Sequence, residues 1–431
     1  MSIERSEARS ELTVGRVSIE RSEARATATT TRWGRIVIVG LLALAPWGVV
    51  APAPAAAADN CVTTGEATDA EPTAVPWSQQ RIKPELAWPL TMGEGITVAV
   101  IDSGIDAKHQ QLAGQVIAGT DFLGAPGGPS TADCNGHGTE VAGIIAAKQV
   151  RGAPLHGVAP GATLLSIRQN ERKGDEVRGG TDTLATALRE AVLRGAKVIN
   201  ISATTDKDDP GLKAAVDFAL ASDVVVVAAA GNDEPGSRPD LAAKAVFWPA
   251  RYDGVLAVAA TDQADKRADL SHSASYVDVA APGREVLTTG ANGPRRYTQV
   301  TGTSFAAPFV SGTAALIRAY HKKLTAGQVV ARIIATADVP PQGRGTADLG
   351  AGIVNPYAAL TAVIPAEGSA AKKVPSPPPV AVPALPVPAD HSVRNRALAI
   401  SAIAGGTALL LVIAAAVVPR GRARRWQPRR R

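Results

Sequence analysis

The chain has 431 residues, of which 45% are apolar but only 4% aromatic, so its core has to be built mainly from Ala, Val, Leu and Ile. Its formal net charge of +6 is concentrated in the last twelve residues, which hold seven Arg and no acidic residue. Without those arginines the chain carries −1, the difference between +6 and 7, which argues against a nucleic-acid-binding protein.

The N-terminus contains a duplication and no pattern of a folded domain. Ser2–Arg9 and Ser18–Arg25 are the same octapeptide, SIERSEAR. No apolar spacing of a helix or strand accompanies it, so we expect residues 1–35 to be an unstructured extension.

Residues 36–58 resemble the apolar and cleavage regions of a secretory signal peptide. Arg32 and Arg35 precede the apolar run Ile36–Val50, and Ala55–Ala58 supplies the small residues of an A-x-A cleavage site. A retained membrane anchor is the alternative, but the run is short and ends in small residues. The sequence therefore predicts export and cleavage.

Residues 59–94 are irregular and contain Cys61, one of only two cysteines; the other is Cys134. An even pair of cysteines in an exported protein predicts one disulfide. Two free buried thiols are the alternative.

The pattern of a folded domain covers residues 95–364. Short apolar runs alternate with helical patterns, which predicts βαβ units around a parallel sheet. The clearest helix follows Thr181–Asp182, which we expect to be its N-cap, and ends near Gly195. The predicted strands are Ile96–Ile101, Thr163–Ile167, Lys197–Ile201, Val224–Ala230 and Val255–Ala260.

The C-terminal part of the sequence reads as a linker, a membrane span and a basic tail. Residues 365–396 are rich in proline and predict a semi-extended spacer. Residues 397–418 are uncharged and, as a helix, would extend roughly 33 Å, enough to cross a bilayer. Residues 419–431 carry the arginines and are expected in the cytoplasm, which places the folded domain outside.

Three stretches of small residues each contain one reactive side chain. Asp102 follows the first predicted strand, where active sites of parallel sheets lie, although an isolated Asp there is more often a turn or cap residue. His137 lies between two glycines, and imidazole is the usual general base near neutral pH. Ser304 precedes a long apolar helix, whose N-terminus would stabilise a nearby oxyanion. Taken alone, Ser304 would be read as a helix cap.

Asn232 follows the predicted strand Val224–Ala230 in a Gly-Asn pair. Its side-chain amide is suited to donate a hydrogen bond to an oxyanion, whereas the alternative is an ordinary turn residue.

These stretches together resemble the subtilisin-like serine peptidase family over roughly residues 76–364. The resemblance rests on VIDSGID (Val100–Asp106), NGHGTEVAGIIA (Asn135–Ala146) and GTSFAAPFVSG (Gly302–Gly312), in the order Asp, His, Ser. It implies an α/β three-layer sandwich with a mostly parallel central sheet, to which the predicted C-terminal transmembrane helix is added.

The resemblance also implies a role for each residue. Asp102, His137 and Ser304 would be the catalytic triad of an endopeptidase, with Asn232 in the oxyanion hole. Ser202, in Asn200-Ile201-Ser202, would lie in the strand that binds extended substrate. The sequence continues Ala203-Thr204-Thr205 where the family usually has glycines, which leaves the specificity pocket undefined.

The whole layout resembles the mycosins, membrane-anchored subtilases associated with type VII secretion. It implies that residues 59–94 wrap the catalytic domain through a Cys61–Cys134 disulfide, although many mycosins have a second bridge that this chain cannot form. The expected partners are a protein or peptide substrate, the membrane and a type VII secretion complex. The alternative function is a structural component of that complex, with proteolysis secondary.

No cofactor and no metal site are expected. Asp206, Asp208 and Asp209 cluster in one loop and could ligate calcium, but the sequence favours a solvated turn.

Overall fold

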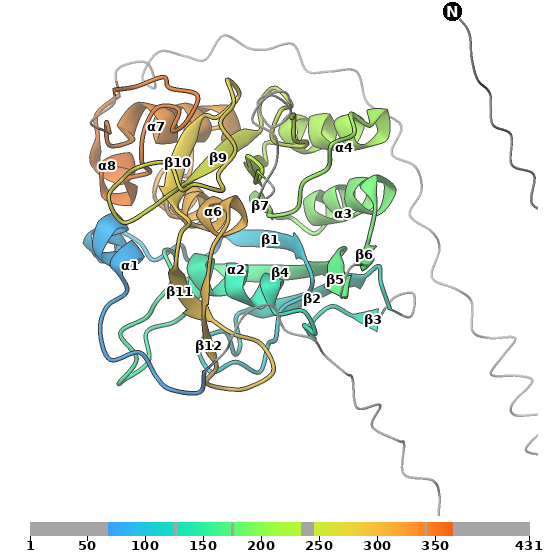
Figure 1. Cartoon of the computed structure of the whole chain (residues 1–431), viewed down its shortest axis with the longest axis vertical. Helices are drawn as coiled ribbons and strands as arrows, with labels where there is room; N and C mark the ends of the chain where they lie inside the picture. Colours follow the sequence, from blue (N-terminus) through green and yellow to red (C-terminus); the bar gives the residue numbers. More distant parts are fainter. Residues whose placement is uncertain (1–67, 125–127, 174–175, 234–244, 341–342, 365–431) are drawn as a thin grey trace, which may run out of the picture. The chain divides into compact units, whose positions relative to one another are not determined.

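The computed structural model describes residues 68–364, except 125–127, 174–175, 234–244 and 341–342 (Figure 1). The predicted signal peptide, Cys61, the linker and the apolar segment 397–418 lie outside these residues, so the predictions about them remain untested. Within the described part of the chain, no helix has the length and apolar character needed to cross a membrane.

An eight-stranded sheet forms the centre of the domain, in the order β10-β9-β8-β7-β1-β4-β2-β3. Every neighbouring pair is parallel except β2 with β3. The strands are β1 (Thr97–Asp102), β2 (Val116–Asp121), β3 (Gly128–Pro129), β4 (Thr163–Arg168), β7 (Val198–Ile201), β8 (Val225–Ala229), β9 (Leu256–Thr261) and β10 (Val279–Pro282). All five predicted strands are present. The sequence analysis missed β2, whose first three residues are not fully buried, the two-residue β3 and the four-residue β10.

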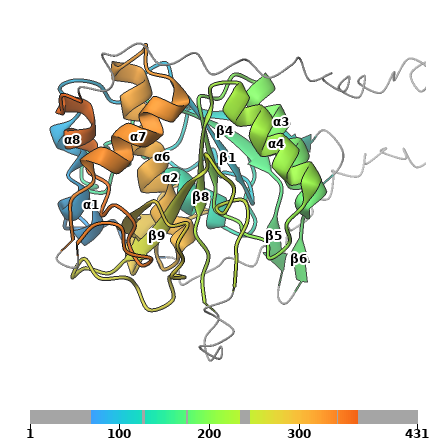
Figure 2. The same ribbon diagram turned by 90° about the horizontal axis from the view of Figure 1, so that it is seen from above.

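Helices cover both faces of the sheet (Figure 2). In β1, Val98 and Val100 pack into one apolar cluster with α2, α6, α7 and α8, whereas Ala99 and Ile101 pack into another with α3 and α4. This alternation confirms the predicted α/β fold with a mostly parallel sheet. The helices are α1 (Trp77–Ile82), the 3₁₀ helix η1 (Pro84–Leu86), α2 (His137–Ala146), α3 (Thr181–Leu193), α4 (Pro210–Ala221), α6 (Thr303–Tyr320), α7 (Ala326–Thr336) and α8 (Pro356–Thr361).

The start of α3 differs from the prediction. Thr181 is the first helical residue and Gly180 is the N-cap, because the Thr183 hydroxyl accepts the backbone N–H of Gly180 at 3.0 Å. A hydroxyl three residues into the helix thus replaces the expected side-chain cap. The helix ends at Leu193, shortly before Gly195, as predicted.

Two small antiparallel sheets flank the main one. β5 (Glu171–Lys173) pairs with β6 (Glu176–Arg178), and β11 (Val286–Thr289) pairs with β12 (Tyr297–Val300). β11 holds the first turn of α2, since the hydroxyls of Thr288 and Thr289 donate to backbone carbonyls of that helix at 2.8 Å each. The position of α2 is therefore fixed from the side opposite β1.

Candidate active site

Asp102 ends β1, a central strand that lies between β7 and β4. Its side chain is 1% exposed. The Oδ1 atom accepts the backbone N–H of Ser103 at 2.7 Å, and Oδ2 is buried without a hydrogen bond to any described residue. The carboxylate thus presents negative charge at the carboxyl edge of the sheet, as predicted for its position.

His137 is the first residue of α2, and its Nδ1 lies 2.7 Å from Oδ1 of Asp102. A tight contact between backbones makes this possible. The N–H of Gly138 donates to the Ser103 hydroxyl at 2.9 Å, and a Cβ on Gly138 would lie only 2.0 Å from the carbonyl oxygen of Gly104. Only glycine lets the helix start this close to the end of β1.

The electrostatic setting of His137 favours its protonated form. Burial lowers the pKa of the imidazole, but the charge and hydrogen bond of Asp102, aided by the charges of Glu140 and Asp133, outweigh it and raise the pKa to about 9. Because the Asp102 contact uses Nδ1 and the side chain is 23% exposed, Nε2 is the nitrogen left for a reacting group.

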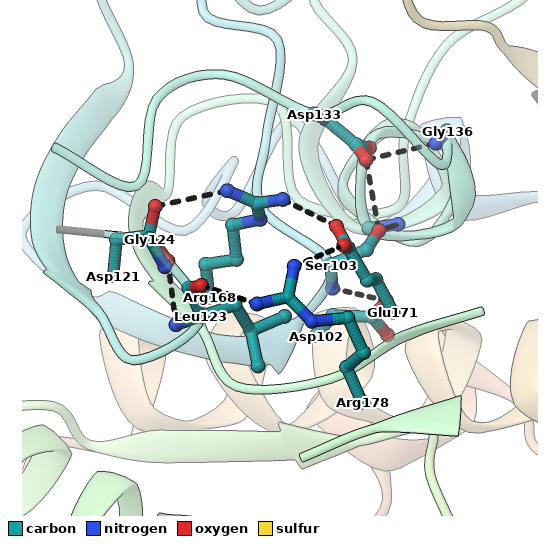
Figure 3. Close-up of polar contacts among 11 residues, drawn as sticks. Asp102, Ser103, Asp121, Leu123, Gly124, Asp133, Gly136, Arg168, Glu171 and Arg178 are labelled. Atoms are coloured by element: carbon teal, nitrogen blue, oxygen red, sulfur yellow. Dashed lines mark hydrogen bonds and ion pairs between the residues drawn. The ribbon is translucent and has the colours of Figure 1, made fainter. Parts of the chain in front are cut away.

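A guanidinium near Asp102 is committed to other carboxylates. Arg168 pairs with Asp102 in the β1–β4 register, but its side chain binds Asp121 at 2.9 Å and also Glu171 (Figure 3). Arg178 adds a second guanidinium to Glu171 at 2.9 Å. Burial raises the pKa of Glu171, but the two arginines outweigh it and hold that pKa below its usual range. The Asp102 carboxylate is therefore left to His137.

Asp133 organises the turn before His137. Its carboxylate is buried and accepts the N–H of Gly136 at 2.8 Å and the Ser103 hydroxyl at 2.9 Å (Figure 3). It also accepts the N–H and the hydroxyl of Thr139. Burial raises the pKa of Asp133, although these four hydrogen bonds favour its ionised form. The sequence analysis did not predict a role for Asp133. The signal that could have pointed to it is an acidic residue four positions before His137.

Ser304 is the second residue of α6 and is bound to the end of β7. Its hydroxyl donates to the carbonyl of Ser202 at 2.9 Å, and the Ser202 hydroxyl donates back to the Ser304 carbonyl at 2.7 Å. No hydrogen bond joins Ser304 to His137 in this structure. The ring centroid of the next residue, Phe305, lies 5.0 Å from that of His137.

A buried polar chain anchors the Ser304 backbone. Asn200 donates to the Ser202 hydroxyl at 2.9 Å and accepts the Ser311 hydroxyl at 2.8 Å. Asn200 and Ser311 are fully buried. The chain ties the third turn of α6 to β7 and thereby fixes the first turn. No local pattern predicts the Ser311 contact, because it joins residues 111 positions apart.

Asn232 lies beside the N-terminus of α6. Its Oδ1 accepts the backbone N–H of Thr303 at 3.0 Å and the Thr303 hydroxyl at 3.1 Å. These contacts orient the amide so that Nδ2 remains a donor. The N–H of Ser304, in the first turn of α6, has no acceptor within the helix. The Ser304 N–H and the Asn232 side chain therefore lie together at the N-terminus of α6.

The aspartates of the loop before α4 have structural contacts. Asp209 caps α4 by accepting the N–H of Leu212 at 2.8 Å, and Asp208 accepts the Tyr252 hydroxyl at 2.9 Å. In the described ranges, no group of three or more His, Cys, Asp and Glu residues is placed to hold a metal ion. Cys134 precedes α2 and is not a free thiol, but its expected partner Cys61 lies outside the described residues.

Comparisons with known proteins agree on one family. The sequence model of the subtilase family matches residues 93–357. Mycosin-4 of Mycobacterium tuberculosis is 40% identical over 73% of this chain and 76% of its own length. The solved structure of MycP3, a protease from the type VII (ESX-3) secretion system, is 34% identical with a TM-score of 0.59, covering 69% of this chain and 92% of its own. A chain of the intact ESX-5 inner membrane complex is 31% identical with a TM-score of 0.61, covering 84% of this chain and 93% of its own.

Proposed function

Since the chain belongs to the subtilase family, and within it to the mycosins, we propose that it is a membrane-anchored endopeptidase that uses a Ser–His–Asp triad. The chain is a subtilisin-like serine peptidase. The observation that carries the proposed mechanism is the 2.7 Å contact between Nδ1 of His137 and Oδ1 of Asp102, next to the helix that begins with Thr303 and Ser304.

In the proposed reaction, Ser304 is the nucleophile. Its hydroxyl leaves the Ser202 carbonyl, turns to Nε2 of His137 and attacks the peptide carbonyl while His137 takes the proton. His137 then protonates the leaving amine, and water hydrolyses the acyl-enzyme by the same route. Asp102 holds the imidazole in the tautomer with the proton on Nδ1 and stabilises the imidazolium that forms.

The developing oxyanion is stabilised by Nδ2 of Asn232 and the backbone N–H of Ser304. The Thr303 contacts fix the amide of Asn232 before substrate arrives, so no reorganisation is needed as charge develops. Removing one such donor costs about 10²–10³ in kcat, a value for which subtilisin itself is the reference case. Ser202, at the end of β7, is proposed to contribute to binding of extended substrate.

The proposed location is the outer face of the cytoplasmic membrane. An apolar segment at 397–418 would anchor the chain, the basic tail 419–431 would lie in the cytoplasm, and a Cys61–Cys134 disulfide would attach the N-terminal extension. The similarity to a chain of the ESX-5 inner membrane complex supports an inner membrane secretion complex as the partner. We propose a protein substrate that passes through, or lies near, such a complex.

A second candidate function is structural support of the secretion complex, with proteolysis secondary. The observation that favours it is the similarity to a chain that is itself part of an assembled inner membrane complex.

Fluorophosphonate labelling of the full-length protein in isolated membranes tests the proposed activity. We expect strong labelling that is lost in Ser304→Ala, because only an activated hydroxyl reacts quickly. Ser222→Ala is the matched control, since the Ser222 hydroxyl only donates to the Phe218 carbonyl at the end of α4. Equal labelling of Ser304→Ala and the wild type would refute Ser304 as nucleophile.

A secretion assay with the same variants separates the two functions. If proteolysis is the biological role, Ser304→Ala stops export of the dependent protein. If the chain is chiefly structural, Ser304→Ala supports export and only deletion of the chain stops it.

A further inference from the structure

A second histidine–aspartate pair lies next to the predicted oxyanion donor. Nδ1 of His272 is 2.7 Å from Oδ1 of Asp233, the residue that follows Asn232. Nε2 of the same ring is 3.0 Å from the backbone carbonyl oxygen of Ala245. His272 is 1% exposed, so neither nitrogen exchanges these contacts for bulk water.

The two contacts fix the ring between a carboxyl group and a backbone carbonyl. A backbone carbonyl can only accept a hydrogen bond, so Nε2 must donate to Ala245. That leaves Nδ1 for the hydrogen bond with the Asp233 carboxyl group.

The backbone around His272 holds the segment that carries Asn232. The N–H of His272 donates to the Gly231 carbonyl at 3.0 Å, and the Asp233 N–H donates to Leu270 at 2.8 Å. The Tyr276 hydroxyl donates to the Ala230 carbonyl at 3.0 Å. Three positions around Asn232, namely Ala230, Gly231 and Asp233, are therefore fixed by the segment 270–276.

Aromatic packing leaves this segment little room to move. The Phe247 ring packs edge-on against His272, with centroids 5.0 Å apart, and also occupies the space beside Gly231. A Cβ on Gly231 would lie 2.1 Å from that ring, and the φ of Gly231 is +109°. The chain turns at Gly231, where Phe247 packs on one side and the backbone N–H of His272 binds the Gly231 carbonyl.

We propose that His272, hydrogen-bonded to the Asp233 side chain, is a positioning residue for the oxyanion donor Asn232. The Oδ1 contacts with Thr303 orient the Asn232 side chain, and the His272–Asp233 pair fixes its backbone. The proposal rests on the proposed function, because it assigns a purpose to the position of Asn232.

Kinetics of the full-length protein on a fluorogenic peptide test the proposed role of His272. We expect His272→Gln to lower kcat by roughly tenfold with KM within about twofold, less than complete loss of an oxyanion donor. In an Asn232→Ala background the same change should have no further effect, because it acts through Asn232. Equal losses in both backgrounds would refute the proposal. His321→Gln is the matched control, since His321 binds only the Leu360 carbonyl, at the end of α6.

Asp233→Asn provides a conservative variant that preserves the geometry. Nδ1 of His272 can accept a hydrogen bond from the introduced amide while Nε2 still donates to Ala245, so kcat should stay within about twofold of the wild type. A loss as large as that of His272→Gln would contradict positioning through this contact.

Nitrogen-15 NMR of the histidine-labelled protein gives an answer that needs no activity. We expect the ring signals of His272, recognised by their shift in Asp233→Asn, to show a proton on Nε2 that is protected from solvent exchange. A rapidly exchanging Nε2 proton would overturn the proposal even if His272→Gln failed to fold. Absence of Ser304-dependent turnover together with a protected Nε2 proton would instead refute the proposed function.

Discussion

The buried carboxylate of Asp133 binds Thr139 twice, accepting its backbone N–H at 2.8 Å and its hydroxyl at 2.7 Å. Thr139 is two residues beyond His137, and Asp133 is four residues before it. The carboxylate therefore closes the turn on which the imidazole is presented, and it does so without touching the imidazole.

Replacing Asp133 should therefore destabilise the fold and slow the reaction. Asp133→Ala leaves four donors without an acceptor in a buried site, and we expect a loss of about 3 kcal/mol in the free energy of unfolding, measured with urea. Asp133→Asn keeps one acceptor and should lose less. Asp269→Ala, at a side chain 94% exposed, is the control and should change stability by less than about 0.5 kcal/mol. An unchanged urea midpoint in Asp133→Ala would contradict this role.

Gly138→Ala should separate His137 from Asp102. The added Cβ would lie 2.0 Å from the Gly104 carbonyl oxygen, so α2 has to shift away from β1. A displacement of about 1 Å costs roughly 10² in turnover, which we expect in kcat for a peptide substrate. Gly327→Ala, also in the first turn of a helix but with open space around the new Cβ, is the matched control. Wild-type kcat in Gly138→Ala would show that the close contact is dispensable.

The raised pKa of His137 predicts an alkaline activity profile. The imidazole acts as a base only when neutral, so kcat/KM of the free enzyme should rise with pH up to about 9. Asp102→Asn removes the charge that raises this pKa, so the rise should occur at lower pH, while kcat falls by about 10⁴. A profile that Asp102→Asn leaves unshifted would be inconsistent with the contact.

The same pKa makes a prediction about stability. Because the pKa of His137 is higher in the folded state than its ordinary value of 6.5, the pair with Asp102 stabilises the fold fully below about pH 6.5. That contribution is lost as the pH rises through about 9. Thermal unfolding at pH 6 and pH 10 should therefore show a smaller difference between the wild type and Asp102→Asn at the higher pH.

Reduction should weaken the attachment of the N-terminal extension. A Cys61–Cys134 disulfide would close a loop long enough to contribute roughly 4 kcal/mol in the chain-entropy model. We expect Cys134→Ser to lower the melting temperature of the oxidised protein and to abolish its response to dithiothreitol. Equal melting temperatures of the wild type with and without dithiothreitol would argue against the bridge.

Local sequence was sufficient to predict the fold class and to select the candidate reactive residues. Asp102, His137 and Ser304 each lie in a short stretch of small residues, and the five apolar runs each formed a strand. Patterns of this kind depend on neighbours a few positions apart, which is the range over which hydrophobic periodicity and helix capping act. The N-cap of α3 is Gly180, one residue before the predicted Thr181, because the hydroxyl that binds the N-cap backbone belongs to Thr183 inside the helix.

The tertiary structure decided how the reactive residues are held. The contacts of Asp133 with Ser103, of Asn200 with Ser311 and of His272 with Asp233 join residues 30 to 111 positions apart. None of them leaves a periodic pattern, because a buried hydrogen bond needs only two complementary groups that the fold brings together. The sequence by itself determined which side chains are candidates for the reaction, and the packing of α2, α6 and the loop around His272 against the sheet decided their geometry.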